Sequence, residues 1–116
     1  MSLLSPLTSV AAALAGAAAL LASGHALASV DGAAALKLAQ ANACMACHAV
    51  DRKMVGPAYK DIAAKYKGMD VDTLAASIKA GGAGKWGPVP MPAQANLKPE
   101  DAKTLAAWIL AGAPSK

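Results

Sequence analysis

The sequence CMACH at residues 44–48 is the segment around which we expect the chain to fold. Residues three and four positions apart share a face of a helical turn, so Cys44, Cys47 and His48 point toward one object. A C-x-x-C-H sequence is typical of c-type haem attachment. The two thiols would form thioethers with the haem vinyl groups, and the imidazole of His48 would bind the iron. The motif therefore predicts one covalently bound haem c per chain.

Other uses of the cysteine pair stay open at this point. A thiol-disulfide catalyst shares the C-x-x-C spacing, but it needs a strand-helix-strand setting, for which the chain shows no pattern. A zinc site needs four ligands, and the other candidates outside residues 1–28 are carboxylates. A disulfide between Cys44 and Cys47 would close a very small loop and stabilise little. We therefore prefer haem attachment.

The composition indicates one small all-α domain. The chain has 116 residues, 56% of them hydrophobic, and it contains no Phe. This length argues against a multidomain enzyme. Val, Ile and Thr are sparse, and no stretch alternates apolar and polar residues over the length of a strand. Because a small domain without Phe buries little apolar side-chain area, we expect a cofactor to complete the core.

Residues 1–28 have the composition of a secretory signal peptide. They contain no charged side chain, residues 10–22 are an unbroken run of Ala, Leu, Gly and Val, and Ala26-Leu27-Ala28 supplies a cleavage pattern. We predict that residues 29–116 form a monohaem domain that is exported to the periplasm, with no membrane span after cleavage. No Lys or Arg precedes the apolar run, so an uncleaved anchor stays open. The mass of the exported protein distinguishes the two.

The charge balance is mildly basic. Eleven Lys and Arg residues face seven Asp and Glu residues, which gives a net charge of +4. This excess favours partners with acidic surfaces. The basic residues are scattered and form no arginine-rich arm, so we predict no nucleic-acid partner.

Four helices are predicted from caps and apolar spacing. Asp31 and Asp70 are candidate N-caps, and Pro57 and Pro99 suit the first position of a helix. Glycines mark several of the expected ends. The predicted helices span residues 31 to about 43, 56 to 68, 70 to 81, and 99 to 112.

The second axial ligand is predicted to be a methionine. The only other histidine, His25, lies in the predicted signal peptide, and Met is the usual partner of His in cytochromes c. We prefer Met91, because Pro90 and Pro92 limit its backbone freedom and reduce the entropy lost on coordination. The candidates considered are Met45, Met54, Met69 and Met91.

The chain resembles the small bacterial class I cytochromes c, the cytochrome c-551 and c-552 group. The resemblance rests on Cys44 to His48, on MVGPAYK at residues 54–60, on WGPVPMP at residues 86–92 and on LAAWIL at residues 105–110. It implies a chain of four or five helices wrapped around one haem with His and Met axial ligands. It also implies that the Pro57 carbonyl accepts a hydrogen bond from His48 and that Trp86 reaches a haem propionate.

Three regions depart from that family pattern. Where relatives often have an aromatic residue in the first helix, this chain offers Leu36, Leu38 and Ala39. An Arg near a propionate in some relatives is replaced at Ser77, which leaves Lys79 as the nearest cation. The side-chain amide that supports the Met sulfur in relatives is matched here by either Gln94 or Asn96.

A haem iron with two strong axial ligands has no open position for a substrate, so we predict an electron carrier and not an enzyme. A small apolar patch would frame the exposed haem edge, with lysines around it to steer an acidic partner. The patch residues expected are Met45, Ala46, Val55, Pro88, Val89, Pro92 and Ala93, and the lysines are Lys53, Lys85 and Lys98.

The resemblance implies a monomer that exchanges electrons with periplasmic nitrite reductase, a terminal oxidase or a quinol-oxidising complex. The alternative is a five-coordinate haem enzyme or gas-binding sensor of the cytochrome c-prime kind. Such proteins carry C-x-x-C-H near the carboxyl terminus of a four-helix bundle, whereas here it lies near the amino terminus of the predicted mature chain.

Overall fold

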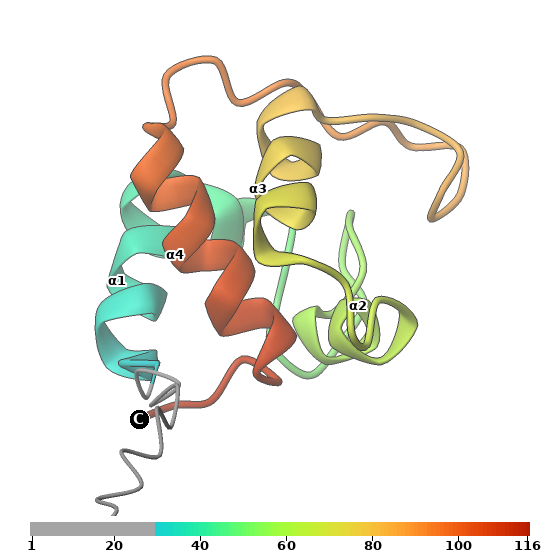
Figure 1. Cartoon of the computed structure of the whole chain (residues 1–116). Coiled ribbons are helices and arrows are strands. Elements are labelled where there is room, and N and C mark those ends of the chain that lie inside the picture. The colour runs from blue at the N-terminus through green and yellow to red at the C-terminus, as the bar shows by residue number, and fades with distance from the viewer. Residues whose placement is uncertain (1–29) are drawn as a thin grey trace, which may run out of the picture.

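The computed structural model describes residues 30–116, and this part of the chain is helical (Figure 1). Its elements are α1 (Gly32–Ala41), the short 3-10 helix η1 (Cys44–Ala46), α2 (Tyr59–Lys65), α3 (Val71–Ala80) and α4 (Pro99–Leu110). Within these residues there is no strand, and one isolated bridge pairs Gly82 with Met91. The predicted all-α fold is therefore confirmed. The predicted signal peptide, residues 1–28, lies outside the described residues.

The predicted helix starts at aspartate and proline are confirmed for three helices. The side chain of Asp31 accepts a hydrogen bond from the Ala34 amide (3.0 Å), and that of Asp70 accepts one from the Thr73 amide (3.1 Å). Each bond satisfies an amide that the first turn of a helix leaves unpaired. Helix α4 begins at Pro99, as predicted.

The predicted start of the second helix is wrong. Helix α2 begins at Tyr59 and not at Gly56-Pro57, and Ala58 before it is extended. The amide of Tyr59 donates to the Ala49 carbonyl (2.9 Å), and the amide of Gly56 donates to the Cys47 carbonyl (2.7 Å). These contacts hold residues 56–58 against the segment that follows the cysteine motif. Tertiary contacts therefore override the preference of proline for a first helical turn.

Helix α4 is at the centre of the fold and packs against α1, α2 and α3. In Figure 1 it lies between α1 and α3, with α2 near its carboxyl end. Trp108 is 1% exposed, and the edge of its ring meets Tyr59 with 5.1 Å between ring centroids. Helix α1 contributes the fully buried Ala35 and Ala39. Two alanines of α1 therefore pack in the core that α1 shares with α4, where the family pattern suggested an aromatic residue. The core is small and rich in alanine.

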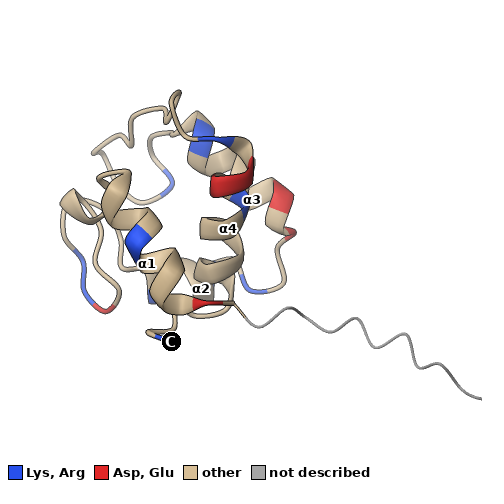
Figure 2. Ribbon diagram, turned by 90° about the vertical axis from the view of Figure 1, so that its left-hand side faces the viewer, with Lys and Arg blue, Asp and Glu red and all other residues tan. Residues whose placement is uncertain are grey.

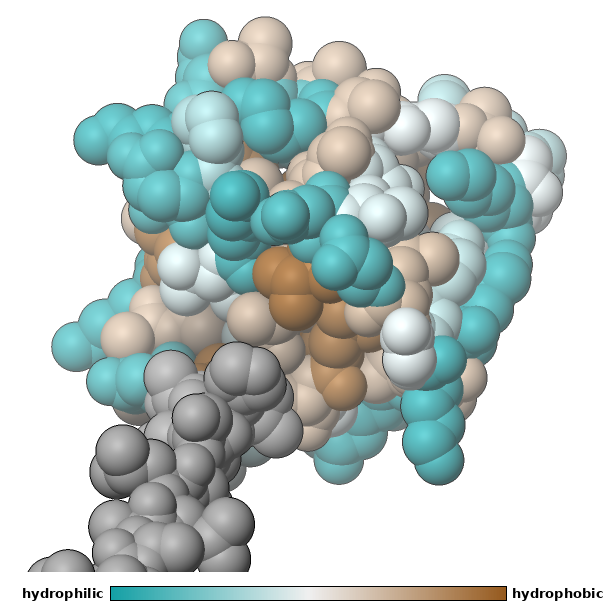
Figure 3. All heavy atoms as spheres, viewed as in Figure 1, coloured by the Kyte–Doolittle hydropathy of each residue, from teal (hydrophilic) through white to brown (hydrophobic). Residues whose placement is uncertain are grey.

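Charged side chains occupy many of the exposed positions of the described residues. Lys and Arg are spread over several elements (Figure 2), and the face formed by α1 and α4 shows only a small strongly apolar area (Figure 3). Lys60 pairs with Asp51 (2.8 Å) and Lys103 with Asp72 (3.3 Å), and all four side chains are exposed, so these pairs stabilise little. None of the helices described is both long and apolar enough to cross a membrane.

Candidate functional site

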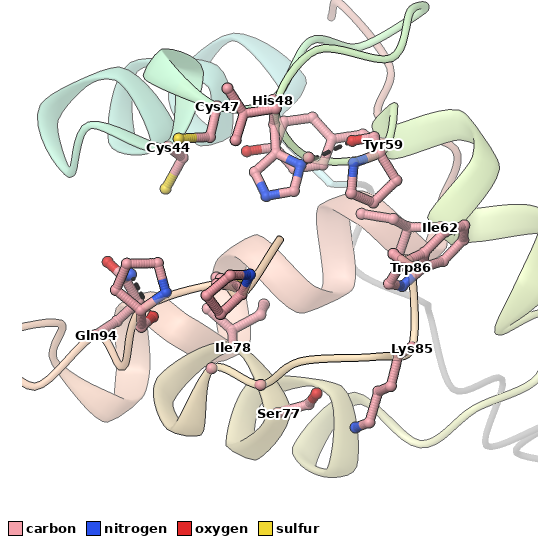
Figure 4. Close-up of a pocket in the computed structure, with 18 of the residues that line it drawn as sticks. Cys44, Cys47, His48, Tyr59, Ile62, Ser77, Ile78, Lys85, Trp86 and Gln94 are labelled. Atoms are coloured by element: carbon pink, nitrogen blue, oxygen red, sulfur yellow. Dashed lines mark hydrogen bonds between the residues drawn. The ribbon is translucent and has the colours of Figure 1, made fainter. Parts of the chain in front are cut away.

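The imidazole of His48 is fixed from two sides. Its Nδ1 donates a hydrogen bond to the Pro57 carbonyl at 2.7 Å, and its ring stacks on Tyr59 with 5.0 Å between centroids and an angle of 19°. Because Nδ1 carries the proton, Nε2 keeps its lone pair. In the described part of the chain Nε2 has no hydrogen-bond partner, and the ring extends into a cavity (Figure 4). This is the arrangement of a metal-binding histidine.

Gly56 leaves room for this imidazole. A Cβ added to Gly56 would lie 2.6 Å from Cε1 and 2.9 Å from Nδ1 of His48. The ring cannot retreat without giving up its stacking on Tyr59. The sequence analysis used Gly56 as the start of a helix and as part of the MVGPAYK motif, whereas the structure gives it a role in seating His48.

We expect Gly56→Ala to destabilise the protein by about 1–3 kcal/mol, which is typical of overpacking a well-filled site. The measurement is the free energy of unfolding by denaturant. Lys53→Ala, at an exposed position of the same loop, serves as the control and is expected to change that free energy by less than about 0.5 kcal/mol. Equal stability of the two variants would show that His48 has more freedom than these contacts indicate.

The cavity has a volume of about 300 Å³ and lies between the cysteine motif and the segment after α3. Cys44, Cys47 and His48 lie on one side, and Ser77, Ile78 and Gln94 lie on the other (Figure 4). Apolar side chains from three helices complete its walls, among them Ile62, Leu74, Leu105 and Ile109. The cavity is therefore apolar, with sulfur and imidazole ligands concentrated at one side.

No disulfide joins Cys44 and Cys47, so that alternative use of the pair is not realised here. Burial raises the pKa of the Cys44 thiol, which keeps the unreacted group protonated at neutral pH. Within residues 30–116 no group of three or more His, Cys, Asp and Glu side chains is arranged so that it could hold a metal ion, so a zinc ion would lack a complete ligand set there. The nearby Tyr59 also stays neutral, because burial raises the pKa of its phenol.

Of the methionines in residues 30–116, only Met91 lines the cavity. Its amide donates to the Gly82 carbonyl (2.7 Å), and its carbonyl accepts from the Gly82 amide (3.0 Å). Met45 and Met69 are half-buried and pack against the hydrophobic core, while Met54 is exposed on the surface. Position therefore supports the preference for Met91 over the other three.

Among the polar residues considered, Gln94 and Ser77 line the cavity, whereas Asn96 and Lys79 do not. The Gln94 side chain donates to the Pro92 carbonyl (2.8 Å), next to Met91. The Lys79 ammonium donates to the Leu97 carbonyl. The Lys79 ammonium is thus engaged by the backbone and is not at the cavity, where the resemblance suggested a cation near a propionate.

The expected apolar patch is present only in part. Val55 and Val89 are 57% and 58% exposed and line the mouth of the cavity, together with Pro92. Ala46, Pro88 and Ala93 are exposed but do not line it, and Met45 packs against the core. Of the expected lysines, Lys85 lines the cavity, whereas Lys53 and Lys98 do not.

Trp86 lies at the edge of the cavity (Figure 4) and is 37% exposed. The edge of its ring meets Tyr66, with 6.0 Å between centroids and an angle of 80°, and the Lys65 ammonium lies 4.3 Å from its centroid. Sequence reasoning missed Lys65 and Tyr66. It also gave no sign of the stack of Tyr59 on His48, because nothing local in the sequence indicates that contact.

The residues of the cavity fit a haem. Its apolar walls suit a porphyrin. The two thiols and the imidazole of the cysteine motif lie together on one side, and Met91, with its thioether sulfur, belongs to the segment that forms the other side. The seat that Gly56 leaves for His48 keeps Nε2 directed into the cavity. These neutral nitrogen and sulfur donors are those that bind the iron in cytochromes c.

Comparisons with known proteins all point to one family. A family model described as Cytochrome c matches residues 32–113. Cytochrome c-551 of Pseudomonas denitrificans is 55% identical over 76 residues, which cover 64% of this chain and 92% of the relative. Cytochrome c-552 of Nitrosomonas europaea is 51% identical over 96 residues, which cover 81% of this chain and 87% of the relative.

Solved structures with the same fold include the wild-type Nitrosomonas europaea cytochrome c552. The crystal structure of that protein has a TM-score of 0.63 and 52% identity, and the match covers 66% of this chain and 96% of that chain. A class 1 cytochrome of Sideroxydans lithotrophicus has a TM-score of 0.59 and 32% identity, covering 73% of this chain and 99% of that chain.

Proposed function

The chain belongs to the cytochrome c family, as a small class I cytochrome that carries electrons on a covalently bound haem c, and we propose that His48 and Met91 are its iron ligands and the periplasm its location. The observation that carries the ligand assignment is that Met91 alone among the described methionines lines the cavity into which His48 extends. A haem in this cavity exchanges one electron between its Fe(III) and Fe(II) states.

The residues of the cavity have distinct roles in this proposal. Cys44 and Cys47 hold the haem through thioethers, and the hydrogen bond from His48 to Pro57 fixes the imidazole tautomer and strengthens it as a ligand. The thioether of Met91 raises the reduction potential by favouring the ferrous state. Trp86, at the cavity edge, would hold a haem propionate through its indole N–H. The apolar walls exclude water and limit reorganisation during electron transfer.

A five-coordinate haem protein is the competing function, and carbon monoxide distinguishes the two. We expect the ferrous protein to bind carbon monoxide slowly and incompletely, because the gas must displace Met91. The measurement is the ferrous absorption spectrum with and without the gas. Rapid and complete binding would favour a five-coordinate enzyme or sensor and would rule out a strong methionine ligand. A colourless protein able to reduce insulin disulfides would favour a thiol oxidoreductase instead.

We also propose that residues 1–28 direct export and are removed, so that a monomeric carrier acts in the periplasm. Val55 and Val89 at the cavity mouth form an apolar contact area, and Lys85, which also lines the cavity, contributes positive charge. Such a surface suits brief, salt-sensitive encounters with acidic redox partners. Candidate partners are periplasmic nitrite reductase, a terminal oxidase and a quinol-oxidising complex. Reduction and oxidation kinetics against these proteins at two ionic strengths test the assignment.

A further inference from the structure

The loop that carries Met91 is held firmly at its base. Gly82 and Met91 exchange two backbone hydrogen bonds (3.0 and 2.7 Å), and the Gln94 amide donates to the Lys79 carbonyl at the end of α3 (2.8 Å). A Cβ on Gly81 would collide with the Met91 carbonyl and would lie 2.7 Å from the Pro92 carbonyl carbon. The two ends of the loop, near Gly82 and Met91, can therefore move away from α3 only if several of these contacts break together.

The rest of the loop, residues 83–90, is exposed and has few ties to the protein. Gly84 and Gly87 both have positive φ (84° and 114°), and the Gly84 amide donates to the Gly87 carbonyl within the loop (3.1 Å). Among the described residues, the one hydrogen bond from another element to residues 83–90 comes from Lys65, whose ammonium donates to the Lys85 carbonyl (2.8 Å).

The same ammonium lies over the face of Trp86, 4.3 Å from its centroid, and the Tyr66 ring meets the edge of that indole. A cation over an indole face is attracted by the ring quadrupole, and a hydrogen bond from a charged donor is stronger than one between neutral groups. We call the set of Lys65, Tyr66, Trp86 and the Lys85 carbonyl the Lys65 clasp. It ties the end of α2 to the far part of the Met91 loop, beside the cavity that Tyr66, Lys85 and Trp86 line.

We propose that the Lys65 clasp holds the Met91 loop closed and so limits how often Met91 leaves the iron, which makes Lys65 a positioning residue that protects the haem from external ligands. The inference rests on the proposed ligand role of Met91. In a two-state description the loop opens rarely, and an external ligand binds only to the open form. The apparent affinity for that ligand is then proportional to the open fraction.

The test uses the complete haem-loaded protein in its ferric state, with imidazole as the external ligand. Imidazole is neutral, so a change in net charge has little direct effect on its binding. The displacement of Met91 by imidazole is measured as the loss of the long-wavelength charge-transfer band. Three variants are compared with the wild type, namely Lys65→Met, Lys65→Arg and Lys67→Met. Lys67 is exposed and close in sequence, and its replacement removes the same charge.

We expect Lys65→Met to raise the apparent association constant of imidazole about three- to tenfold, as the loss of one exposed cation–π contact and one hydrogen bond allows. Lys67→Met should behave as the wild type. Lys65→Arg should also remain close to the wild type, because a guanidinium stacks on an indole and donates to a carbonyl.

Two results would overturn the clasp. One is equal imidazole binding in the wild type, Lys65→Met and Lys67→Met. The other is a steep rise of the imidazole association constant at low, non-denaturing urea concentrations. Opening of the loop exposes little surface, so it should depend only weakly on urea. A steep dependence would mean that imidazole reaches the iron through unfolding of a larger part of the protein. A wild-type protein that lacks the charge-transfer band would instead remove Met91 as a ligand, and the clasp proposal with it.

Discussion

A Met91→Ala variant is expected to lose the long-wavelength charge-transfer band of the ferric protein completely and to have a lower reduction potential than the wild type. The thioether favours ferrous iron, so its removal shifts the balance toward the ferric state. The expected fall is on the order of 0.1 V, a modest part of the roughly 0.8 V over which axial ligands set haem potentials. The measurements are the ferric absorption spectrum and a redox titration.

Two further variants separate ligation from packing. Met91→Leu conserves volume but removes the sulfur, so it should lose the band as the alanine variant does while keeping more of the stability. Met69→Ala should keep the band and lose about 1–3 kcal/mol of stability, because Met69 is half-buried against the core. Loss of the band in Met69→Ala and its persistence in Met91→Ala would reverse the assignment of the ligand.

Local signals in the sequence were sufficient for most of the fold. Asp31 and Asp70 cap their helices through hydrogen bonds that reach only three residues along the chain, so a short motif contains the whole interaction. Pro99 starts α4 for a similarly local reason. Pro57 failed as a helix start because its carbonyl is needed by His48, and that requirement arises from the site and not from the neighbouring residues.

The site was predictable where one motif held its parts and less so where distant segments meet. Residues 44–48 contain both thiols and the imidazole, and the prolines around Met91 indicated a stiff loop. The stack of Tyr59 on His48 and the contact of Lys65 with Trp86 join separate segments. Their geometry depends on how the loop after the cysteine motif and the loop after α3 are placed. The pattern of apolar and polar residues within either loop does not predict how the two loops are placed relative to each other.

A Cys44→Ser/Cys47→Ser double variant is expected to lose most of its helical structure. An apolar cavity of about 300 Å³ would have to be filled with water or collapse. At about 24 cal/mol per Å³, an unfilled cavity of this size costs up to about 7 kcal/mol. The whole stability of a small domain is only about 5–15 kcal/mol, and the core here is rich in alanine. The measurements are far-ultraviolet circular dichroism and the cooperativity of thermal unfolding.

The matched control is Ala46→Ser, which places the same side chain at an exposed position between the two cysteines and should leave haem attachment and helicity unchanged. Native-like helicity and a cooperative transition in the cofactor-free double variant would refute the view that haem completes the core. Addition of free haem to the double variant separates two contributions. His48 and Met91 are still present there, so recovery of helicity would show that filling the cavity stabilises the fold. The remaining deficit would then measure what the thioether bonds add.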